Sequence, residues 1–159
     1  DSYNCGPVAI INALKWSGSK VTYKSLKRLK KECRSTFENR GTNRSDFDKI
    51  LRKSGKRIFG VSRVRSSSIK HIVEHLRSGG AVAVNLMWDI NNRKDSHYGL
   101  TTNVSASGQT FTVVNFYSNE TLSKIRRRTL VDHLTKRTRV GYYRLSIFPI
   151  AWLLTPNRR

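Results

Sequence analysis

The chain has 159 residues, the length of one ordinary domain, and no internal repeat or low-complexity tract divides it. Lys and Arg number 31 against 10 Asp and Glu, giving a formal net charge of +21. Hydrophobic residues make up 37% and occur in runs, which excludes wholesale disorder, and no run is long enough to cross a bilayer. Two cysteines are too few for a disulfide framework, and residues 1–7 lack the features of a signal peptide. We therefore expect a single domain in an intracellular, reducing compartment.

The first third of the chain predicts three helices, because apolar residues recur at helical spacing between residues that cap or end helices. The expected extents are 5–17 after an Asn4 cap, about 22–33 after a Thr22 cap, and from Thr42 or Ser45 to Gly55. The first helix is apolar on most sides and should be central and buried. The third should turn Phe47, Ile50 and Leu51 inward.

Beyond residue 56 the sequence is mainly strand-like. The expected strands are 57–64, 81–88, 97–104, 110–116 and 142–148. A helix should begin after Ser67 or Ser68 and end at Gly79, and residues 105–109 should form a hairpin turn. Residues 120–137 are ambiguous and fit either a helix or an irregular basic arm. Because helices come first and strands follow, we expect an α+β fold with an antiparallel sheet.

Cys5 opens the first predicted helix, in the run Asn4-Cys5-Gly6-Pro7. A cysteine at a helix N-terminus lies at the positive end of the helix dipole, beside unpaired main-chain N–H groups. Both features favour the thiolate that a nucleophile needs, and the same N–H groups can stabilise an oxyanion. The missing side chain of Gly6 would leave room for a substrate. The alternative is a small structural cysteine at a helix start.

His97 and Asn115 stand at the facing ends of two strands that a short hairpin joins. Their side chains can therefore meet. The Asn115 carboxamide could accept a hydrogen bond from one imidazole nitrogen, which leaves the other nitrogen to serve Cys5 as base and acid. Taken alone, each of these two residues is more often an ordinary surface or structural residue.

The ordered set resembles the papain-like cysteine peptidases, and among them the bacteriocin-leader (double-glycine) peptidase group. The matching motifs are Asn4-Cys5-Gly6-Pro7, Leu76-Arg77-Ser78-Gly79 before an apolar strand, Ser96-His97-Tyr98, and Asn115, within residues 1–117. The resemblance implies a nucleophile-bearing central helix packed on an antiparallel sheet. It also implies Cys5 as nucleophile, His97 as general base and acid, Asn115 as the orienting residue, and no cofactor or metal.

Two features depart from that group. Its members carry a Gln before the Cys that completes the oxyanion hole, and residues 1–4 contain none. Asn4 or Ser2 could take that place, so Asn4 and Cys5 are the candidate oxyanion residues. Residues 118–159, a basic extension of the sheet region, also have no counterpart in the pattern.

His71-Ile72-Val73-Glu74-His75 matches the H-x-x-E-H pattern of one class of zinc peptidases. Both histidines could share one helix face, but a catalytic zinc needs a third protein ligand, and only Glu120 remains downstream. The simpler interpretation is an amphipathic helix with its histidines outside.

Basic residues are densest in residues 19–65 and 124–144. Two clusters are the candidate phosphate-binding residues: Arg126, Arg127, Arg128, Lys136, Arg137 and Arg139. A charge of +21 attracts polyanions, of which nucleic acid is the commonest, and the alternative is a solvated face.

Three functions stay open on the sequence. The first is a cysteine peptidase with a Cys5–His97–Asn115 triad, acting on a polypeptide and associated with a polyanion. The second is a non-catalytic, basic nucleic-acid-binding or virion structural protein on the same fold, located in the virion interior. The third is thiol-dependent acyl transfer by the same residues.

Overall fold

The computed structural model describes residues 4–34, 42–65, 69–87, 96–116, 122–135, 138–140, 143–145 and 150–157. The helices are α1 (Cys5–Trp16), α2 (Tyr23–Arg34), α3 (Arg44–Gly55), α4 (Ile69–Arg77) and α5 (Arg127–Thr135). The strands are β1 (Phe59–Arg65), β2 (Ala81–Met87), β3 (Ser96–Val104), β4 (Thr110–Val114), β5 (Leu122–Arg126), β6 (Thr138–Val140), β7 (Tyr143–Leu145) and β8 (Ile150–Pro156). Within these ranges no helix is long and apolar enough to span a membrane.

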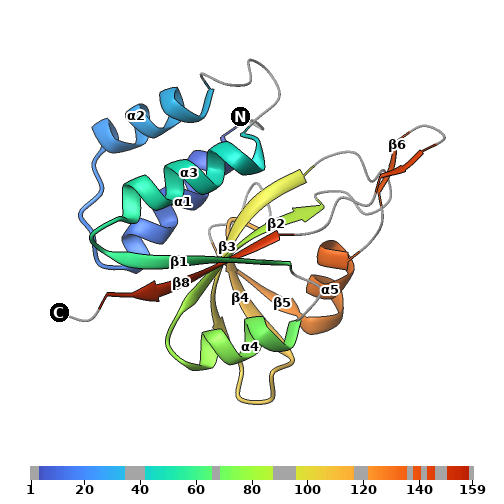
Figure 1. The fold of residues 1–159 in the computed structure, drawn as a ribbon. Coiled ribbons are helices and arrows are strands. Elements are labelled where there is room, and N and C mark those ends of the chain that lie inside the picture. The colour runs from blue at the N-terminus through green and yellow to red at the C-terminus, as the bar shows by residue number, and fades with distance from the viewer. Residues whose placement is uncertain are drawn as a thin grey trace.

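Six strands form one sheet in the order β1-β8-β2-β3-β4-β5, and every neighbouring pair is antiparallel (Figure 1). Strands β6 and β7 pair separately. The helices α1, α2 and α3 lie on one face of the sheet, and α4 and α5 lie on the other. The α+β class with an antiparallel sheet is therefore confirmed.

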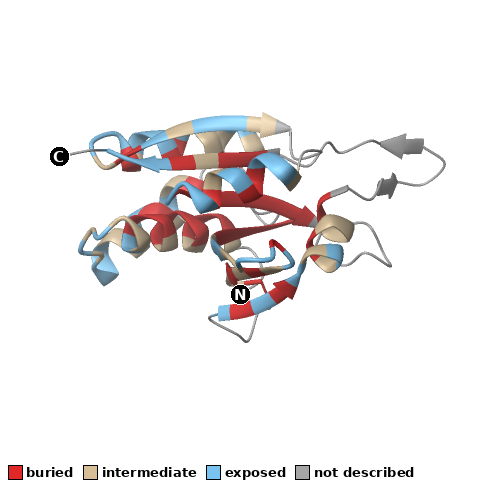
Figure 2. Ribbon diagram, turned by 90° about the horizontal axis from the view of Figure 1, so that it is seen from below, coloured by how far each residue is buried: buried red, intermediate tan, exposed pale blue. Residues whose placement is uncertain are grey.

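The sheet is buried on both faces because apolar side chains of its central strands pack against helices on either side. In β2, Ala81 and Ala83 face α1–α3, whereas Val82 and Val84 face α4 and α5. This is the period of two expected for a pleated strand. Figure 2 shows the resulting layers, with buried segments running through the middle of the molecule.

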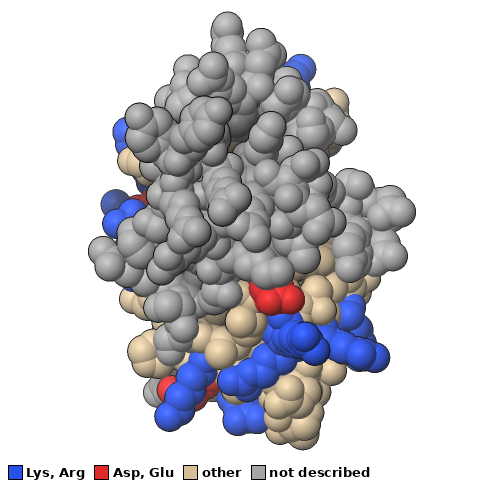
Figure 3. All heavy atoms as spheres, turned by 90° about the vertical axis from the view of Figure 1, so that its right-hand side faces the viewer, with Lys and Arg blue, Asp and Glu red and all other residues tan. Residues whose placement is uncertain are grey.

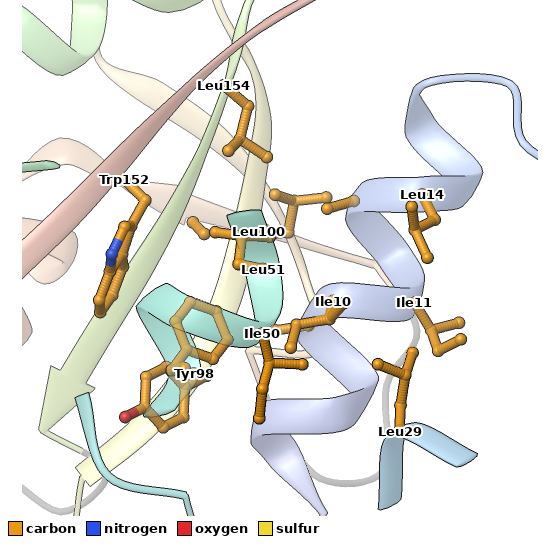
Figure 4. Packing of buried hydrophobic residues seen from close by; sticks show 14 of the residues in the cluster. Ile10, Ile11, Leu14, Leu29, Ile50, Leu51, Tyr98, Leu100, Trp152 and Leu154 are labelled. Carbon is orange, nitrogen blue, oxygen red and sulfur yellow. The ribbon is translucent and has the colours of Figure 1, made fainter. Parts of the chain in front are cut away.

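Three aromatic side chains join the sheet to α3, and Figure 4 labels the two that come from the sheet, Tyr98 and Trp152. The ring of Phe47 stacks on Tyr98 at a centroid distance of 4.2 Å and meets the edge of Trp152 at 4.6 Å. The indole Nε1–H of Trp152 donates to Asp48 Oδ1 across 2.9 Å. A buried indole N–H needs such an acceptor, so Asp48 completes the packing of β8 against α3.

The three N-terminal helices form where the sequence predicts them, but two of the expected caps differ. Asn4 stands at the N-cap of α1 without a side-chain capping hydrogen bond. The cap of α3 is neither Thr42 nor Ser45 but Asn43, whose extended backbone lets its side chain accept from the Asp46 N–H at 2.7 Å. Thr22 does cap α2, by accepting from the Ser25 N–H at 3.2 Å.

The C-terminal third differs most from the prediction. Residues 120–137 were open between a helix and an irregular arm, and the described part forms β5 followed by α5. Residues 150–156, for which no strand was predicted, form β8 in the interior of the sheet, between β1 and β2. Of the strand expected over 142–148, residues 143–145 form β7. Ser67, Ser68 and the rest of that strand lie outside the described residues.

Candidate active site

Cys5 is the first residue of α1, the helix that contacts β3 most extensively on this face of the sheet. Its side chain is half-buried and its thiol is free. The carbonyl of Asn4 accepts the first helical hydrogen bond, from the Val8 N–H at 3.0 Å. The N–H groups of the first turn therefore have no partner within the helix and are available to a group beside the sulfur.

Burial raises the pKa of the Cys5 thiol, and main-chain N–H groups oppose it. The N–H groups of Tyr98, Gly6 and Cys5 itself point to the sulfur and lower its pKa, yet the pKa stays above its usual value. The N–H groups at the start of α1 therefore act in the expected direction, and loss of hydration on burial outweighs them.

Tyr98 links the sulfur to the strand that carries His97. Its N–H points to Cys5, and its hydroxyl donates to the main-chain carbonyl of Thr42 across 2.8 Å. A Cβ on Gly6 would lie 2.5 Å from Thr42 Oγ1 and 2.8 Å from Thr42 Cβ. The space that the sequence analysis assigned to substrate access at Gly6 is therefore occupied by Thr42.

His97 lies at the start of β3, is 7% exposed, and contacts Asn115 just beyond the end of β4. Its Nε2 is 2.5 Å from the main-chain oxygen of Asn115. The two residues meet as the hairpin topology predicts, but the acceptor is the carbonyl, where the carboxamide was expected. Since a carbonyl only accepts, Nε2 carries the proton and Nδ1 is the basic nitrogen.

Burial lowers the pKa of His97, and the hydrogen bond to Asn115 raises it by less. Burial thus favours the neutral form of both the imidazole and the Cys5 thiol. Neutral forms of both groups suit chemistry in which an imidazole removes the thiol proton during attack.

One buried polar contact near the site was not predicted. The Nε of Arg44 donates to Asn85 Oδ1 across 2.7 Å, and Asn85 lies opposite Tyr98 in the β2–β3 register. Burial lowers the pKa of Arg44. The available signal was Asn85 itself, a polar residue inside the apolar run of residues 81–87.

The remaining candidate residues are placed as follows. Asn4 is 7% exposed and lies beside the proposed nucleophile in sequence and in space. Arg126 and Arg128 are exposed, on β5 and α5, whereas Arg127 is half-buried and its Nη1 donates to the Gly108 carbonyl at 3.4 Å. For Arg139 only the backbone, in β6, is described. Ser2, Lys136 and Arg137 lie outside the described residues.

The H-x-x-E-H segment lies on α4, and its second histidine has a structural role. His75 Nε2–H donates to the Leu154 carbonyl across 2.8 Å, which ties α4 to β8. A Cβ on Gly80 would collide with that ring. Across the described ranges, no three His, Cys, Asp or Glu side chains gather as metal ligands.

Comparison with known proteins identifies the fold. The sequence matches no family model and no curated protein. The structure is similar to the peptidase domain of Streptococcus ComA, a bifunctional ABC transporter involved in a quorum-sensing pathway. That comparison has a TM-score of 0.68 at 13% identity and covers 99% of this chain and 94% of that one. It is also similar to a protein from Bacillus anthracis named as a C39-like peptidase, with a TM-score of 0.65 at 8% identity, covering 99% of this chain and 90% of that one. The chain thus has the papain-like fold of the double-glycine cysteine peptidases, as the resemblance of its motifs implied.

Proposed function

We propose that the chain is a cysteine peptidase in which Cys5 is the nucleophile and His97 the general base and acid. One arrangement carries the proposal. The Cys5 sulfur receives the N–H of Tyr98, the residue next to His97, while Asn115 fixes the tautomer of the His97 ring. The fold comparisons support peptidase chemistry over the non-catalytic alternative, because both relatives are named as peptidases.

In the proposed reaction, Sγ of Cys5 attacks a peptide carbonyl and its proton passes to Nδ1 of His97. The carbonyl oxygen becomes an oxyanion, which the Cys5 N–H and the Asn4 side chain would stabilise. Collapse breaks the C–N bond, and His97 returns the proton to the leaving amine, which leaves a thioester on Cys5. His97 then takes a proton from water as the water oxygen attacks the thioester carbonyl. The C–S bond breaks, the carboxylic acid leaves, and His97 returns the proton to the Cys5 sulfur.

Cleavage of a peptide library tests the proposal, with sequences that contain and that lack a glycine pair. The Cys5→Ala variant should lose cleavage entirely, whereas Cys33→Ala should retain it, because Cys33 is a buried residue of α2. Cleavage that survives in Cys5→Ala would refute the assignment. Adding an amine nucleophile distinguishes hydrolysis of the thioester from acyl transfer, because only acyl transfer gives an amide product.

We further propose that a polyanion binds beside β5 and α5. Lys124, Arg126 and Arg128 are exposed there, and Arg77 and Arg127 converge over Gly108, where each donates to a carbonyl of the β3–β4 turn. Figure 3 shows Lys and Arg gathered on the lower, described part of the side where α5 lies. Like charges gathered in this way repel one another, so an anion placed between them is favoured.

A salt titration of single-stranded DNA binding tests this surface. Replacing Arg126 and Arg128 with Gln should weaken binding and reduce the slope of log K against log salt by about 0.7 per lost phosphate contact. The Gln variants of Lys56 and Arg57, exposed residues after α3, are the matched control and should change the slope less. Equal effects in the two pairs would rule out a site at β5 and α5.

A further inference from the structure

The residue that holds the His97 ring has a backbone conformation that few side chains tolerate. Asn115 has φ +59°, and it is the single non-glycine residue with positive φ within the described ranges. This left-handed conformation crowds Cβ against the following carbonyl in L-residues, and asparagine adopts it more readily than most. It occurs immediately after β4, between Val114 and the buried Phe116.

The left-handed turn determines where the Asn115 carbonyl points. Its oxygen lies 2.5 Å from Nε2 of His97. If β4 continued through this residue, the carbonyl would instead point along the hydrogen-bond ladder to a neighbouring strand. A main-chain carbonyl cannot donate a proton, so it accepts only the Nε2–H tautomer of the ring. It is also present whatever side chain stands at the position.

We propose that Asn115 is a positioning residue that acts through its main-chain carbonyl, and that asparagine stands there for its backbone conformation, not for its carboxamide. The inference rests on the proposed function, in which Nδ1 of His97 takes the Cys5 proton. The carbonyl fills the orienting role that a side chain fills in most triads of this type. Residue 115 should then tolerate loss of its side chain but not a side chain that resists positive φ.

Three substitutions separate the carbonyl from the carboxamide. Asn115→Gly removes the carboxamide and keeps positive φ accessible, so it should lose at least about tenfold less kcat/KM than Asn115→Ala does. Asn115→Ala also removes the carboxamide but strains the backbone, so kcat/KM should fall by about tenfold or more. Asn103→Gly, at an exposed position of β3, controls for the general cost of a new glycine.

Nitrogen NMR of the His97 ring gives a second readout that needs no activity. Wild type and Asn115→Gly should both show the proton on Nε2, and Asn115→Ala should show a mixture of tautomers. If wild type carries the proton on Nδ1, the inference fails.

The inference also fails if the Asn115→Gly and Asn115→Ala variants lose activity equally. A loss on the order of 10⁴-fold in both would indicate that the carboxamide itself orients the ring. If the wild type cleaves no peptide, the proposed function fails, while the ring tautomer in wild type and Asn115→Gly still decides the role of the carbonyl.

Discussion

The hydroxyl of Tyr98 donates a 2.8 Å hydrogen bond to the carbonyl of Thr42, 56 residues earlier in the chain. The same residue directs its N–H to the sulfur of Cys5, and Thr42 packs against Gly6. Tyr98 therefore fixes α1 and the segment before α3 relative to β3. The main-chain N–H of Tyr98 thus contacts the proposed nucleophile, while its side chain anchors the segment before α3.

The Tyr98→Phe substitution should destabilise the protein, because the buried Thr42 carbonyl loses its donor. A loss of about 1–3 kcal/mol in the free energy of unfolding is expected, measured by urea denaturation. Tyr23→Phe is the matched control, since Tyr23 is 81% exposed and should show almost no change. Equal stability of the two variants would mean that the Thr42 carbonyl is satisfied in another way.

Gly6→Ala should disturb the site through Thr42. The added Cβ would meet Oγ1 and Cβ of Thr42 at distances that force one of the two segments to move. We expect a loss of about 1–3 kcal/mol in unfolding free energy and a changed alkylation rate at Cys5. Gly60→Ala adds the same atom where its nearest neighbour is a carbonyl 3.9 Å away, and it should leave that rate unchanged.

The rate of Cys5 alkylation should rise with pH, and the midpoint of this rise should lie above the usual thiol pKa of about 8.5. Burial raises the Cys5 pKa, so the thiolate fraction near neutral pH is smaller than that of a free cysteine. Cys33 should react more slowly still, because it is 1% exposed and burial raises its pKa to about 11. Mass spectrometry of iodoacetamide adducts measures both sites. A Cys5 midpoint below pH 7 would instead indicate a preformed thiolate–imidazolium pair.

Acid should destabilise the protein partly through Asp48. Burial raises the pKa of this carboxyl, but hydrogen bonds from Arg52 and Trp152 outweigh burial and hold it below its usual value. A lowered folded-state pKa stabilises the fold above the unfolded value of about 3.9, and this stabilisation is lost as pH falls through the folded value. Asp48→Asn should therefore lose less stability than wild type between pH 6 and pH 3, in urea titrations at each of these pH values. A wild-type acid dependence in Asp48→Asn would exclude this carboxyl as the cause.

The sequence predicts the parts of the fold that depend on local pattern. Helices with one apolar face and strands bounded by Gly79 or by the turn at 105–109 lie where the periodicity places them. The strand β8 was not predicted because residues 150–154 form a short, uniformly apolar run that periodicity alone does not distinguish from a buried helix segment, and, unlike residues 81–88, they do not follow a Gly-Gly turn. Its partners are far away in sequence, and only the assembled sheet identifies them.

At the candidate site, the sequence predicts the contact between His97 and Asn115 but not the atoms that make it or the electrostatics of Cys5. The hairpin topology is enough to pair His97 with Asn115, whereas the choice between carboxamide and carbonyl depends on the backbone angle of Asn115. The direction of the Cys5 pKa likewise depends on how much water the fold removes from the sulfur. Neither quantity is encoded in the local motif.

The position of β8 has a consequence for synthesis. Its two neighbours, β1 and β2, are made long before it, and they do not pair with each other. Until residues 150–156 emerge from the ribosome, both strands have an open edge, and Trp152 and Leu154 are absent from the core against which α1 packs. A nascent chain should therefore complete the core against which Cys5 packs only when translation has passed this strand, and a chain truncated before residue 150 should be prone to aggregate.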